Sequence, residues 1–231
     1  MLRFLNMENP PLSPALNDRA ERQIPGYRSL ARLAVALLSG FPTAAIAAAP
    51  VLVVGCGTGN ELIEARAQRK DWQLTAVDPS LEMLEAARQR LGGDANQVDW
   101  VQGPVEDLPG KQRFAAATAV LVLQELADDG SKLQFLVSLA RLLQPGAPLL
   151  LLDLMGGGSG LNGAMEQQFL AAQNQFQLAS GLELELSPSF EGVFPIGEAR
   201  RSALLNAAGF SDPIRVFQAL QYEGVVALRR Q

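Results

Sequence analysis

The segment VLVVGCGTG at residues 51–59 constrains the fold of this 231-residue chain more than any other part of it. Its first four residues are all apolar and mostly β-branched, as in a strand that is buried on both faces of a parallel sheet. Three glycines at alternating positions then end the run, and a residue without a Cβ atom lets the backbone turn tightly or approach a ligand closely. We therefore expect a strand, a glycine-rich turn and a helix that begins near residue 60.

An acidic residue about 20 positions after the glycines makes the prediction of a ligand site more specific. Asp78 ends the next apolar run, LTAV at 74–77. The carboxyl ends of neighbouring parallel strands lie at one edge of a sheet, where a carboxylate can accept hydrogen bonds from a ribose. The two features together predict a site for a nucleotide-type cofactor, and a tight turn that binds nothing is the alternative.

The glycine spacing decides between two cofactor classes. A GxGxxG motif for NAD would need glycine at position 60, where this chain has Asn60. The spacing present is GxGxG, which resembles motif I of the class I S-adenosylmethionine (SAM) methyltransferases. VDPSLEMLEAAR at 77–88, GPVEDLP at 103–109 and RLLQPGAPLLLLDL at 141–154 resemble further parts of that superfamily. The resemblance implies SAM as the cofactor and S-adenosylhomocysteine (SAH) as the product.

The order of apolar runs and helical patterns predicts an α/β fold, with a doubly wound, mostly parallel sheet. A last helix and a C-terminal antiparallel hairpin would complete the Rossmann-like, seven-stranded fold of the SAM methyltransferases. In the helix at 80–91 we expect Ser80 as the cap and Leu81, Leu84 and Leu91 on one side. The strands are expected near 51–55, 73–77, 98–102, 116–123, 148–154, 214–220 and 224–229, with residues 221–223 as the final turn, and the helices near 60–69, 80–91, 131–143 and 198–209.

Composition agrees with a single SAM-binding domain over residues 1–231. The chain is 48% hydrophobic, and its net charge of −5 argues against an extended nucleic-acid interface, which needs clustered Lys and Arg. It has no histidine and one cysteine, so we expect no metal site, no intrachain disulfide and a reducing, cytoplasmic location. The uncharged stretch 33–60 is interrupted by Gly40, Pro42 and Pro50, so we expect no membrane span.

Two regions outside the strand–helix repeat are expected to form a lid over the substrate. The first is a lid helix at about 14–40, opened by Pro25, with Leu30, Leu33, Ala34 and Leu37 on its apolar side. The second is an insertion at about 156–196, with a flexible joint at 156–160 and a helix near 163–180. Apolar residues in this insertion favour a small, largely neutral or aromatic acceptor, with core packing as the alternative. They are Phe169, Phe176, Phe190, Val193 and Phe194.

RQIPGYRSL at 22–30 and the ending LLNAAGFSDPIRVFQALQYEGVVALRR at 204–230 carry a closer resemblance. They resemble the carboxy-SAM synthases of tRNA wobble-uridine modification and their methyltransferase relatives. Relatives with this lid often pair, which makes a homodimer an expectation by analogy. The resemblance implies cofactor contacts by the residues that match the motifs. These are Tyr27, Gly55, Cys56, Gly57, Gly59, Asp78, Pro79, Met83, Pro104, Val105 and Val120.

Departures from the synthase pattern favour ordinary methyl transfer. The synthases hold the extra carboxylate of their cofactor with a lid arginine, whereas residues 157–199 contain no Arg or Lys. Val120 also stands where the synthases have an asparagine. Val53 replaces the acidic residue that methyltransferases usually have on the first strand, and Pro104 and Ala115 also depart from the pattern. A small-molecule methyltransferase therefore leads, with a carboxy-SAM synthase acting toward tRNA and a non-catalytic SAM-binding module as alternatives.

No catalytic residue is assigned from the sequence. A base is needed only if the acceptor loses a proton, and without histidine the polar candidates are Tyr27, Glu125 and Asp153. Gln124 and Glu125 follow the fourth strand, where many relatives contact the acceptor. The expected substrate-binding residues are Gln124, Glu125, Asp153 and Phe169, with ordinary capping or solvent-facing roles as the alternative.

Overall fold

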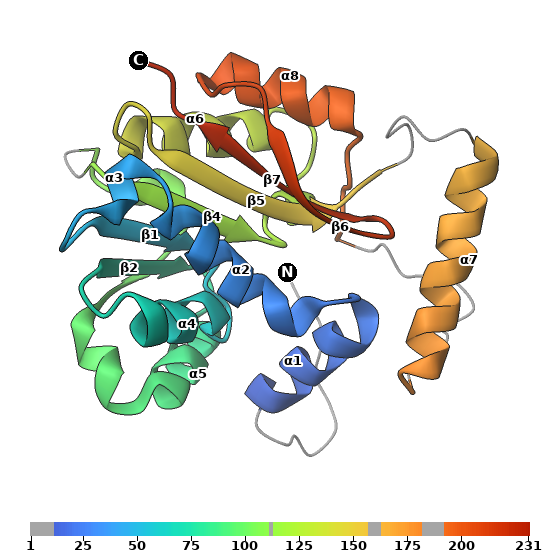
Figure 1. Ribbon diagram of the computed structural model, residues 1–231, viewed down its shortest axis with the longest axis horizontal. Helices are drawn as coiled ribbons and strands as arrows, with labels where there is room; N and C mark the ends of the chain where they lie inside the picture. Colours follow the sequence, from blue (N-terminus) through green and yellow to red (C-terminus); the bar gives the residue numbers. More distant parts are fainter. Residues whose placement is uncertain (1–11, 111–112, 157–162, 182–191) are drawn as a thin grey trace.

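The computed structural model describes residues 12–110, 113–156, 163–181 and 192–231 (Figure 1). Within these residues the strands form one seven-stranded sheet in the order β3-β2-β1-β4-β5-β7-β6. Strands β1 to β5 are parallel, and β7 is antiparallel to both β5 and β6. The expected doubly wound sheet with a C-terminal antiparallel pair is confirmed. The strands are β1 Pro50–Val54, β2 Gln73–Asp78, β3 Val98–Gln102, β4 Ala116–Val120, β5 Pro148–Leu154, β6 Ile214–Ala219 and β7 Tyr222–Leu228.

Helices cover both faces of this sheet (Figure 1). Alternate residues of β1 serve the two faces, because side chains alternate along a strand. Val51 and Val53 pack with α2, α4 and α5, whereas Leu52 and Val54 pack with α6 and α8. The helices are α1 Leu12–Gln23, α2 Tyr27–Ser39, α3 Pro42–Ala45, α4 Asn60–Gln68, α5 Leu81–Leu91, α6 Ser131–Leu142, α7 Gly163–Ala179 and α8 Glu198–Ala208, with short 3₁₀ turns η1 Gly92–Gln97, η2 Val105–Asp107 and η3 Leu123–Glu125.

The strand order places a crevice at the carboxyl ends of β1 and β4. These two strands pair in parallel, with Val51 beside Ala116 and Val54 beside Ala119. The chain runs from β1 toward one edge of the sheet and from β4 toward the other, so their connections diverge at this point, as at the ligand crevice of other open α/β sheets. The glycine turn follows β1 and the η3 segment follows β4, so both border the crevice.

The fourth strand is shorter than predicted. We expected a strand over 116–123, but β4 ends at Val120. Leu121 has a φ of 61°, and its N–H donates to the carbonyl of Leu152 at 2.6 Å. A left-handed residue cannot continue a strand, so the backbone leaves the sheet here and enters η3.

The final turn is tighter than predicted. Residues 221–223 were expected to form it, but Tyr222 and Glu223 belong to β7, and the turn falls at Leu220 and Gln221. Tyr222 is buried beside Leu154, its partner in the register. Glu223 is buried too and forms an ion pair with Arg201. The polar residues at 221–223 are typical of a turn, but the burial of Tyr222 and Glu223 in the folded protein places the turn before them.

The N-terminal region forms two helices where one was expected. The break lies at Ile24–Gly26, and Gly26 has a φ of 81°. Helix α2 buries Leu30 and Ala34 as predicted, together with Ala31, Val35 and Leu38, while Leu33 and Leu37 are half-buried. Because α2 packs on the sheet beside α4, it is part of the helical layer, whereas α1 extends outward and lies beside α7 (Figure 1).

Two other expectations are settled by the helices. In α5, Ser80 caps the first turn as predicted, since its Oγ accepts from the N–H of Met83, but Leu81 is exposed and Ala87 takes its place in the core. Helix α7 confirms the one expected near 163–180, while most of the joint at 156–160 lies outside the described residues. Among the helices described, none is long and apolar enough to cross a membrane.

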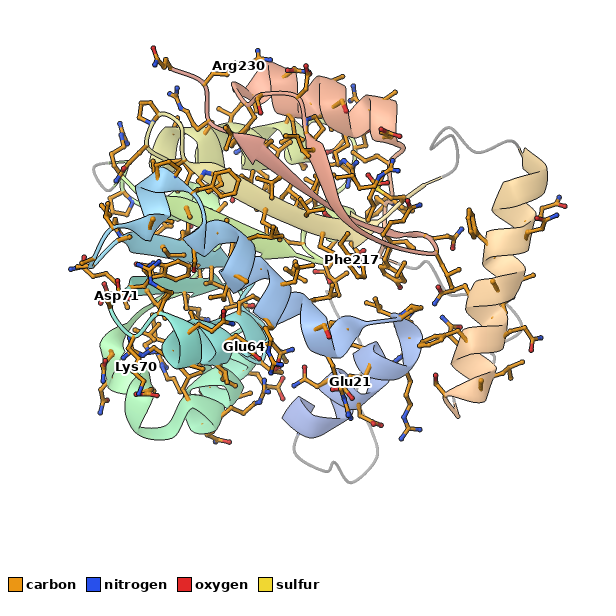
Figure 2. The ribbon with its side chains drawn as sticks, viewed as in Figure 1. Glu21, Glu64, Lys70, Asp71, Phe217 and Arg230 are labelled. Atoms are coloured by element: carbon orange, nitrogen blue, oxygen red, sulfur yellow. The ribbon has the colours of Figure 1, made fainter. Side chains whose placement is uncertain are left out.

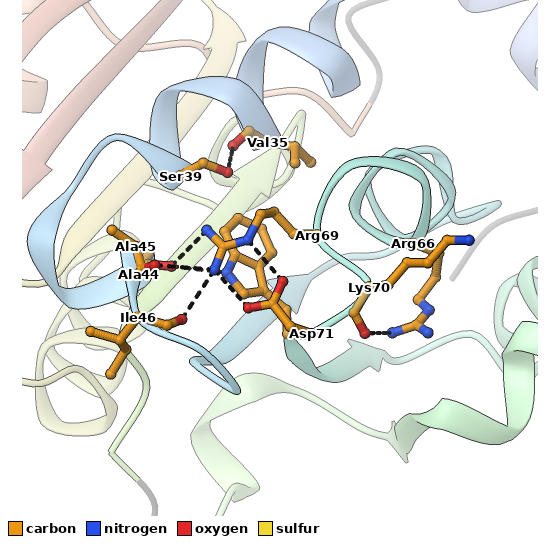
Figure 3. Close-up of polar contacts among 10 residues, drawn as sticks. Val35, Ser39, Ala44, Ala45, Ile46, Arg66, Arg69, Lys70 and Asp71 are labelled. Carbon is orange, nitrogen blue, oxygen red and sulfur yellow. Dashed lines mark hydrogen bonds and ion pairs between the residues drawn. The ribbon is translucent and has the colours of Figure 1, made fainter.

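Arg69 connects residues 44–46, which precede β1, to Asp71, which precedes β2, by hydrogen bonds (Figure 3). Its guanidinium donates to the carbonyls of Ala44 and Ile46, both at 3.0 Å, and binds Asp71 through Nε and Nη2. It also lies over the ring of Trp72, 4.9 Å from the centroid. Carbonyls at a helix end lack partners inside the helix, so Arg69 satisfies groups that α3 leaves open.

Replacing Arg69 by Met should therefore destabilise the fold. The Arg69→Met change removes the Arg69 donor from the carbonyl of Ile46 and leaves the carbonyl of Ala44 with only the indole N–H of Trp72, at 2.9 Å. We therefore expect the free energy of unfolding to fall by about 1–3 kcal/mol. Urea unfolding followed by circular dichroism measures it. The control is Arg32→Met, which removes only an exposed ion pair with Glu64 and should cost less than about 1 kcal/mol. Equal losses in the two variants would contradict the assigned role.

Candidate cofactor site

In the glycine turn after β1, neighbouring side chains crowd Gly55 and Gly59, whereas the space beside Gly57 is open among the described residues. Gly55, Gly57 and Gly59 have φ values of 60°, 50° and 84°, which favour glycine. A Cβ atom on Gly55 would lie 2.3 Å from Cγ2 of Val122, and one on Gly59 would lie 3.0 Å from Cβ of Ala87. A Cβ on Gly57 would meet nothing nearer than a carbonyl at 4.0 Å. Protein packing does not require that opening, so it is available to a ligand.

Asp78 lies directly against this turn, as the sequence predicted. Its Oδ2 accepts from the N–H of Gly57 at 2.9 Å, and its Oδ1 accepts from the N–H of Ser80 at 2.9 Å. The side chain is buried, and these bonds fix its orientation. Because a carboxylate oxygen has two lone pairs, each oxygen can accept one further hydrogen bond. The structure therefore offers a fixed acceptor beside an open backbone turn, which suits the hydroxyls of a ribose.

A pocket of about 160 Å³ lies beside the start of α4, which follows the turn, and Asn60 and Glu61 line it. Asn60 Nδ2 donates to the Tyr27 hydroxyl at 3.2 Å and to Asn17 Oδ1 at 3.1 Å, while Arg90 donates to the carbonyl of Thr58 and to Asn60 Oδ1. These bonds tie α1, α2 and α5 to the glycine turn. Among the residues that line the pocket are Asn17, Tyr27, Asn60, Glu61, Arg90 and Val120.

The electrostatics of the pocket are dominated by buried acidic groups. Burial raises the pKa of Glu61. Burial, and to a lesser extent the charge of Glu61, raises the pKa of Tyr27 to about 12, so this phenol stays protonated at neutral pH. Burial also raises the pKa of the Cys56 thiol, with smaller contributions from Asp78 and Glu61. A neutral, buried thiol is a poor nucleophile.

The other expected cofactor residues lie around this turn in different ways. Pro79 and Pro104 are exposed, and Met83 is half-buried in the first turn of α5. Val120 lines the pocket. Val105 is buried in the core with Val77, so a ligand could reach its backbone but not its side chain.

Gln124 and Asp153 join η3 to β5. The N–H of Gln124 donates to Asp153 Oδ1 at 3.0 Å, and Gln124 Oε1 accepts from the N–H of Leu154 at 2.7 Å. The carbonyl of Gln124 also accepts from Phe194. Gln124 therefore has a structural use that accounts for the oxygen of its side chain. Glu125 is exposed, and its pKa is raised by partial burial and by Asp78, which places it near the crevice.

Asp153 is a buried carboxyl group with a strongly raised pKa. It is 5% exposed, and its Oδ2 has no hydrogen-bond partner among the described residues. Burial raises its pKa to about 7, with Gln124 and Lys132 opposing the rise. The remaining substrate candidate, Phe169, is half-buried on α7, as is Phe176, and Phe190 lies outside the described residues.

An apolar cluster lies next to the pocket at the carboxyl ends of β4 and β5. Its buried members come from the loop after α1, from α2 and from the sheet, and half-buried residues including Val120 and Val193 pack against them. Of the apolar lid residues named from the sequence, Val193 packs against this cluster, whereas Phe194 is exposed. Its buried residues are Ile24, Leu30, Leu152, Leu154 and Tyr222.

Sequence reasoning missed three polar residues of the pocket. Asn17 lies far from the motifs along the chain, and Arg90 lies two residues beyond the motif at 77–88, where no local pattern marks it as a site residue. Glu61 had a readable signal, because it is an acidic residue in the first turn of the helix that follows the glycine turn. The sequence pattern places the expected acid on the strand before the turn, where this chain has Val53.

Comparison with known proteins gives the site a family context. Residues 51–146 match a family model described as "Methyltransferase domain". A ubiquinone biosynthesis O-methyltransferase of Xanthomonas oryzae pv. oryzae is 36% identical over 111 residues, covering 47% of this chain and 44% of the relative. A demethylmenaquinone methyltransferase of Deinococcus radiodurans is 32% identical over 116 residues, covering 50% and 47%. The chain spans about half the length of the curated relatives it matches.

Solved structures share the fold over most of the chain. Human N-acetylserotonin methyltransferase in complex with SAM aligns with a TM-score of 0.63 and 18% identity, covering 95% of this chain and 55% of that one. The mitomycin 7-O-methyltransferase MmcR aligns with a TM-score of 0.65 and 19% identity, covering 95% and 58%. The chain thus has the Rossmann-like fold of the SAM-dependent methyltransferases.

Gly57 provides a direct test of cofactor approach. Gly57→Ala adds a methyl group that the protein has room for, so its cost to folding is the strain of a positive φ, about 1–2 kcal/mol. We expect a loss of SAM affinity beyond what this strain explains, measured by isothermal titration calorimetry. Gly146→Ala is the control, because Gly146 also has a positive φ and open space around it but lies far from the turn. Unchanged SAM binding by the Gly57→Ala variant would show that SAM does not lie against the backbone of Gly57.

Asp153 predicts a specific dependence of stability on pH. Its folded-state pKa of about 7 lies above the ordinary value of 3.8. Between these values the folded state holds a proton that the unfolded state releases, so this carboxyl makes stability fall as pH rises from about 4 to about 7. Asp153→Asn removes the effect. In urea unfolding, the variant should gain about 2–4 kcal/mol relative to the unmodified protein between pH 4 and pH 8. Parallel stability curves would contradict the assignment.

Proposed function

We propose that this protein is a SAM-dependent methyltransferase that methylates a small apolar or aromatic metabolite. The single observation that carries the proposal is the position of the apolar cluster around Leu154 and Tyr222, next to the turn and pocket that suit SAM. The matched relatives named for ubiquinone and menaquinone biosynthesis support an acceptor with a quinone-type or phenolic ring.

The residues of the site are suited to positioning the reactants. SAM, when bound, supplies a methyl carbon that the positive sulfonium already activates for in-line transfer. Asp78 and the glycine turn would hold its ribose, which fixes the direction of the sulfur–methyl bond. The apolar cluster would exclude water and hold an aromatic ring against that methyl group. Correct orientation of two reactants can lower a barrier by about 7–11 kcal/mol, so positioning alone can carry much of the rate.

A phenolic acceptor would also have to lose a proton. Glu125 is the exposed carboxyl group at the carboxyl end of β4, and its raised pKa makes it a stronger base than an ordinary glutamate. Asp153 is fully buried behind Gln124 and bonded to its N–H. We therefore place Glu125, rather than Asp153, in the role of proton acceptor.

The features that argue against carboxy-SAM synthesis are chemical. A second carboxylate on the cofactor would need a paired cation, but residues 157–199 contain no Arg or Lys. The cluster formed by Ile24, Leu152 and Leu154 is apolar. A bare methyl group suits this surface better than an anion does.

A labelled-methyl assay tests the proposed function. Native mass spectrometry of the purified protein should show retained SAM or SAH. With SAM that carries a labelled methyl group, the label should move to a phenol or hydroquinone in a small-molecule panel, with one SAH formed per transfer. Label in undermodified tRNA alone, a retained cofactor that is heavier by a carboxylate, or no binding of SAM by calorimetry would each overturn the proposal. Asp78→Ala should weaken SAM binding by about 1–3 kcal/mol.

A further inference from the structure

Two charged side chains of the pocket have no ionic partner in the described structure. The pocket is lined by Glu21, Arg28, Glu61, Glu64 and Arg90 among other residues. Glu21 forms an ion pair with Arg28 at 2.8 Å, and Glu64 forms one with Arg32 at 3.3 Å. Figure 2 labels Glu21 on α1 and Glu64 on α4. Glu61 and Arg90 take part in no ion pair among the described residues. One carboxyl group and one guanidinium therefore face the same small space, and each acts on the pKa of the other without a direct ion pair between them.

Glu61 is a carboxyl group that lies buried in the wall of the pocket. Its side chain is about nine-tenths buried, with 9% of the residue exposed. It acts on the phenol of Tyr27, whose pKa it helps to raise, so its carboxylate lies near the wall of the pocket that Tyr27 forms. Burial makes the charged form of Glu61 costly, although its own backbone and Arg90 oppose this effect, and a cation bound to the carboxylate would offset more of the cost.

Arg90 is held so that part of its guanidinium remains available. Its three hydrogen bonds to the glycine turn and Asn60 all come from Nη1, and they go to Thr58 O, Thr58 Oγ1 and Asn60 Oδ1. These acceptors are uncharged, so they position the guanidinium without neutralising it. Its remaining N–H groups suit a carboxylate, which a guanidinium binds with strong, charge-assisted hydrogen bonds.

Glu61 and Asp78 both lie close to the glycine turn. Both carboxylates raise the pKa of the Cys56 thiol at the centre of that turn. A ligand whose ribose is bound at Asp78 would cross the open face of Gly57 and extend toward Glu61. The pocket volume of about 160 Å³ is smaller than the range of about 300–1,000 Å³ for sites that hold a whole ligand, so this pocket suits one end of a longer molecule.

We propose that Glu61 and Arg90 bind the amino-acid end of SAM, with Glu61 paired to its ammonium group and Arg90 to its carboxylate. This inference rests on the proposed function, because it assumes that SAM is the ligand. It also accounts for Val53. The acidic group that is missing from β1 is supplied instead from the first turn of α4, where Glu61 lies.

Ligand truncation separates this role from general damage to the site. 5′-Methylthioadenosine keeps the adenosine of SAM but lacks the amino-acid end. By isothermal titration calorimetry, Glu61→Gln should weaken binding of SAM and SAH by about 10- to 100-fold and leave binding of 5′-methylthioadenosine within about twofold. Asp78→Ala should weaken all three ligands. Glu85→Gln, an exposed change on α5 outside the pocket, is the matched control and should weaken none.

A second measurement needs no variant. In the unmodified protein, the analogue of SAH in which a hydroxyl replaces the ammonium should bind about 10- to 100-fold more weakly than SAH. Equal binding of this analogue and SAH would overturn the role of Glu61, as would a Glu61→Gln variant that binds SAM normally or loses all three ligands equally. Failure of the unmodified protein to bind SAM, SAH and 5′-methylthioadenosine would instead refute the proposed function itself.

Discussion

The hydrogen bond from the N–H of Gly57 to the carboxylate of Asp78 is the interaction on which the site depends. It joins the turn after β1 to the end of β2, and the carbonyl of Val77 also accepts from the N–H groups of Gly55 and Cys56. The turn is therefore held against a neighbouring strand at three points. A loop fixed in this way can present its open face to a ligand without paying the entropy of becoming ordered.

Helices from distant parts of the chain complete the site around that turn. Asn17 on α1, Tyr27 on α2 and Arg90 on α5 are all connected to it through Thr58 or Asn60. Position 60 is where a dinucleotide-binding motif would have its third glycine. Asparagine there supplies donors and an acceptor that a glycine could not, so the residue that excludes the GxGxxG motif is also the centre of the polar network.

The apolar and polar halves of the site come from the two sides of the crevice. The polar half lies beside the carboxyl ends of β1 and β2. The apolar half is formed by residues of β5 and β7, with Val120 of β4 packed against them. Val122 connects them, because it fills the space that Gly55 leaves free. This division suits a reaction in which a charged, hydroxyl-rich cofactor meets an apolar acceptor, since each reactant is bound by surface of its own kind.

The local sequence determined those elements whose burial or backbone conformation requires particular residue types. The strand at 51–54, the glycine turn, Asp78 and the Ser80 cap were all readable, because buried parallel strands are uniformly apolar and turns need particular residues. Tertiary structure decided the end of β4 at Leu121, the break between α1 and α2, and the inclusion of Tyr222 and Glu223 in β7. It also decided that Asn17, Glu61 and Arg90 share a pocket. Contacts between residues far apart in the chain leave no periodic pattern, so packing alone fixed these features.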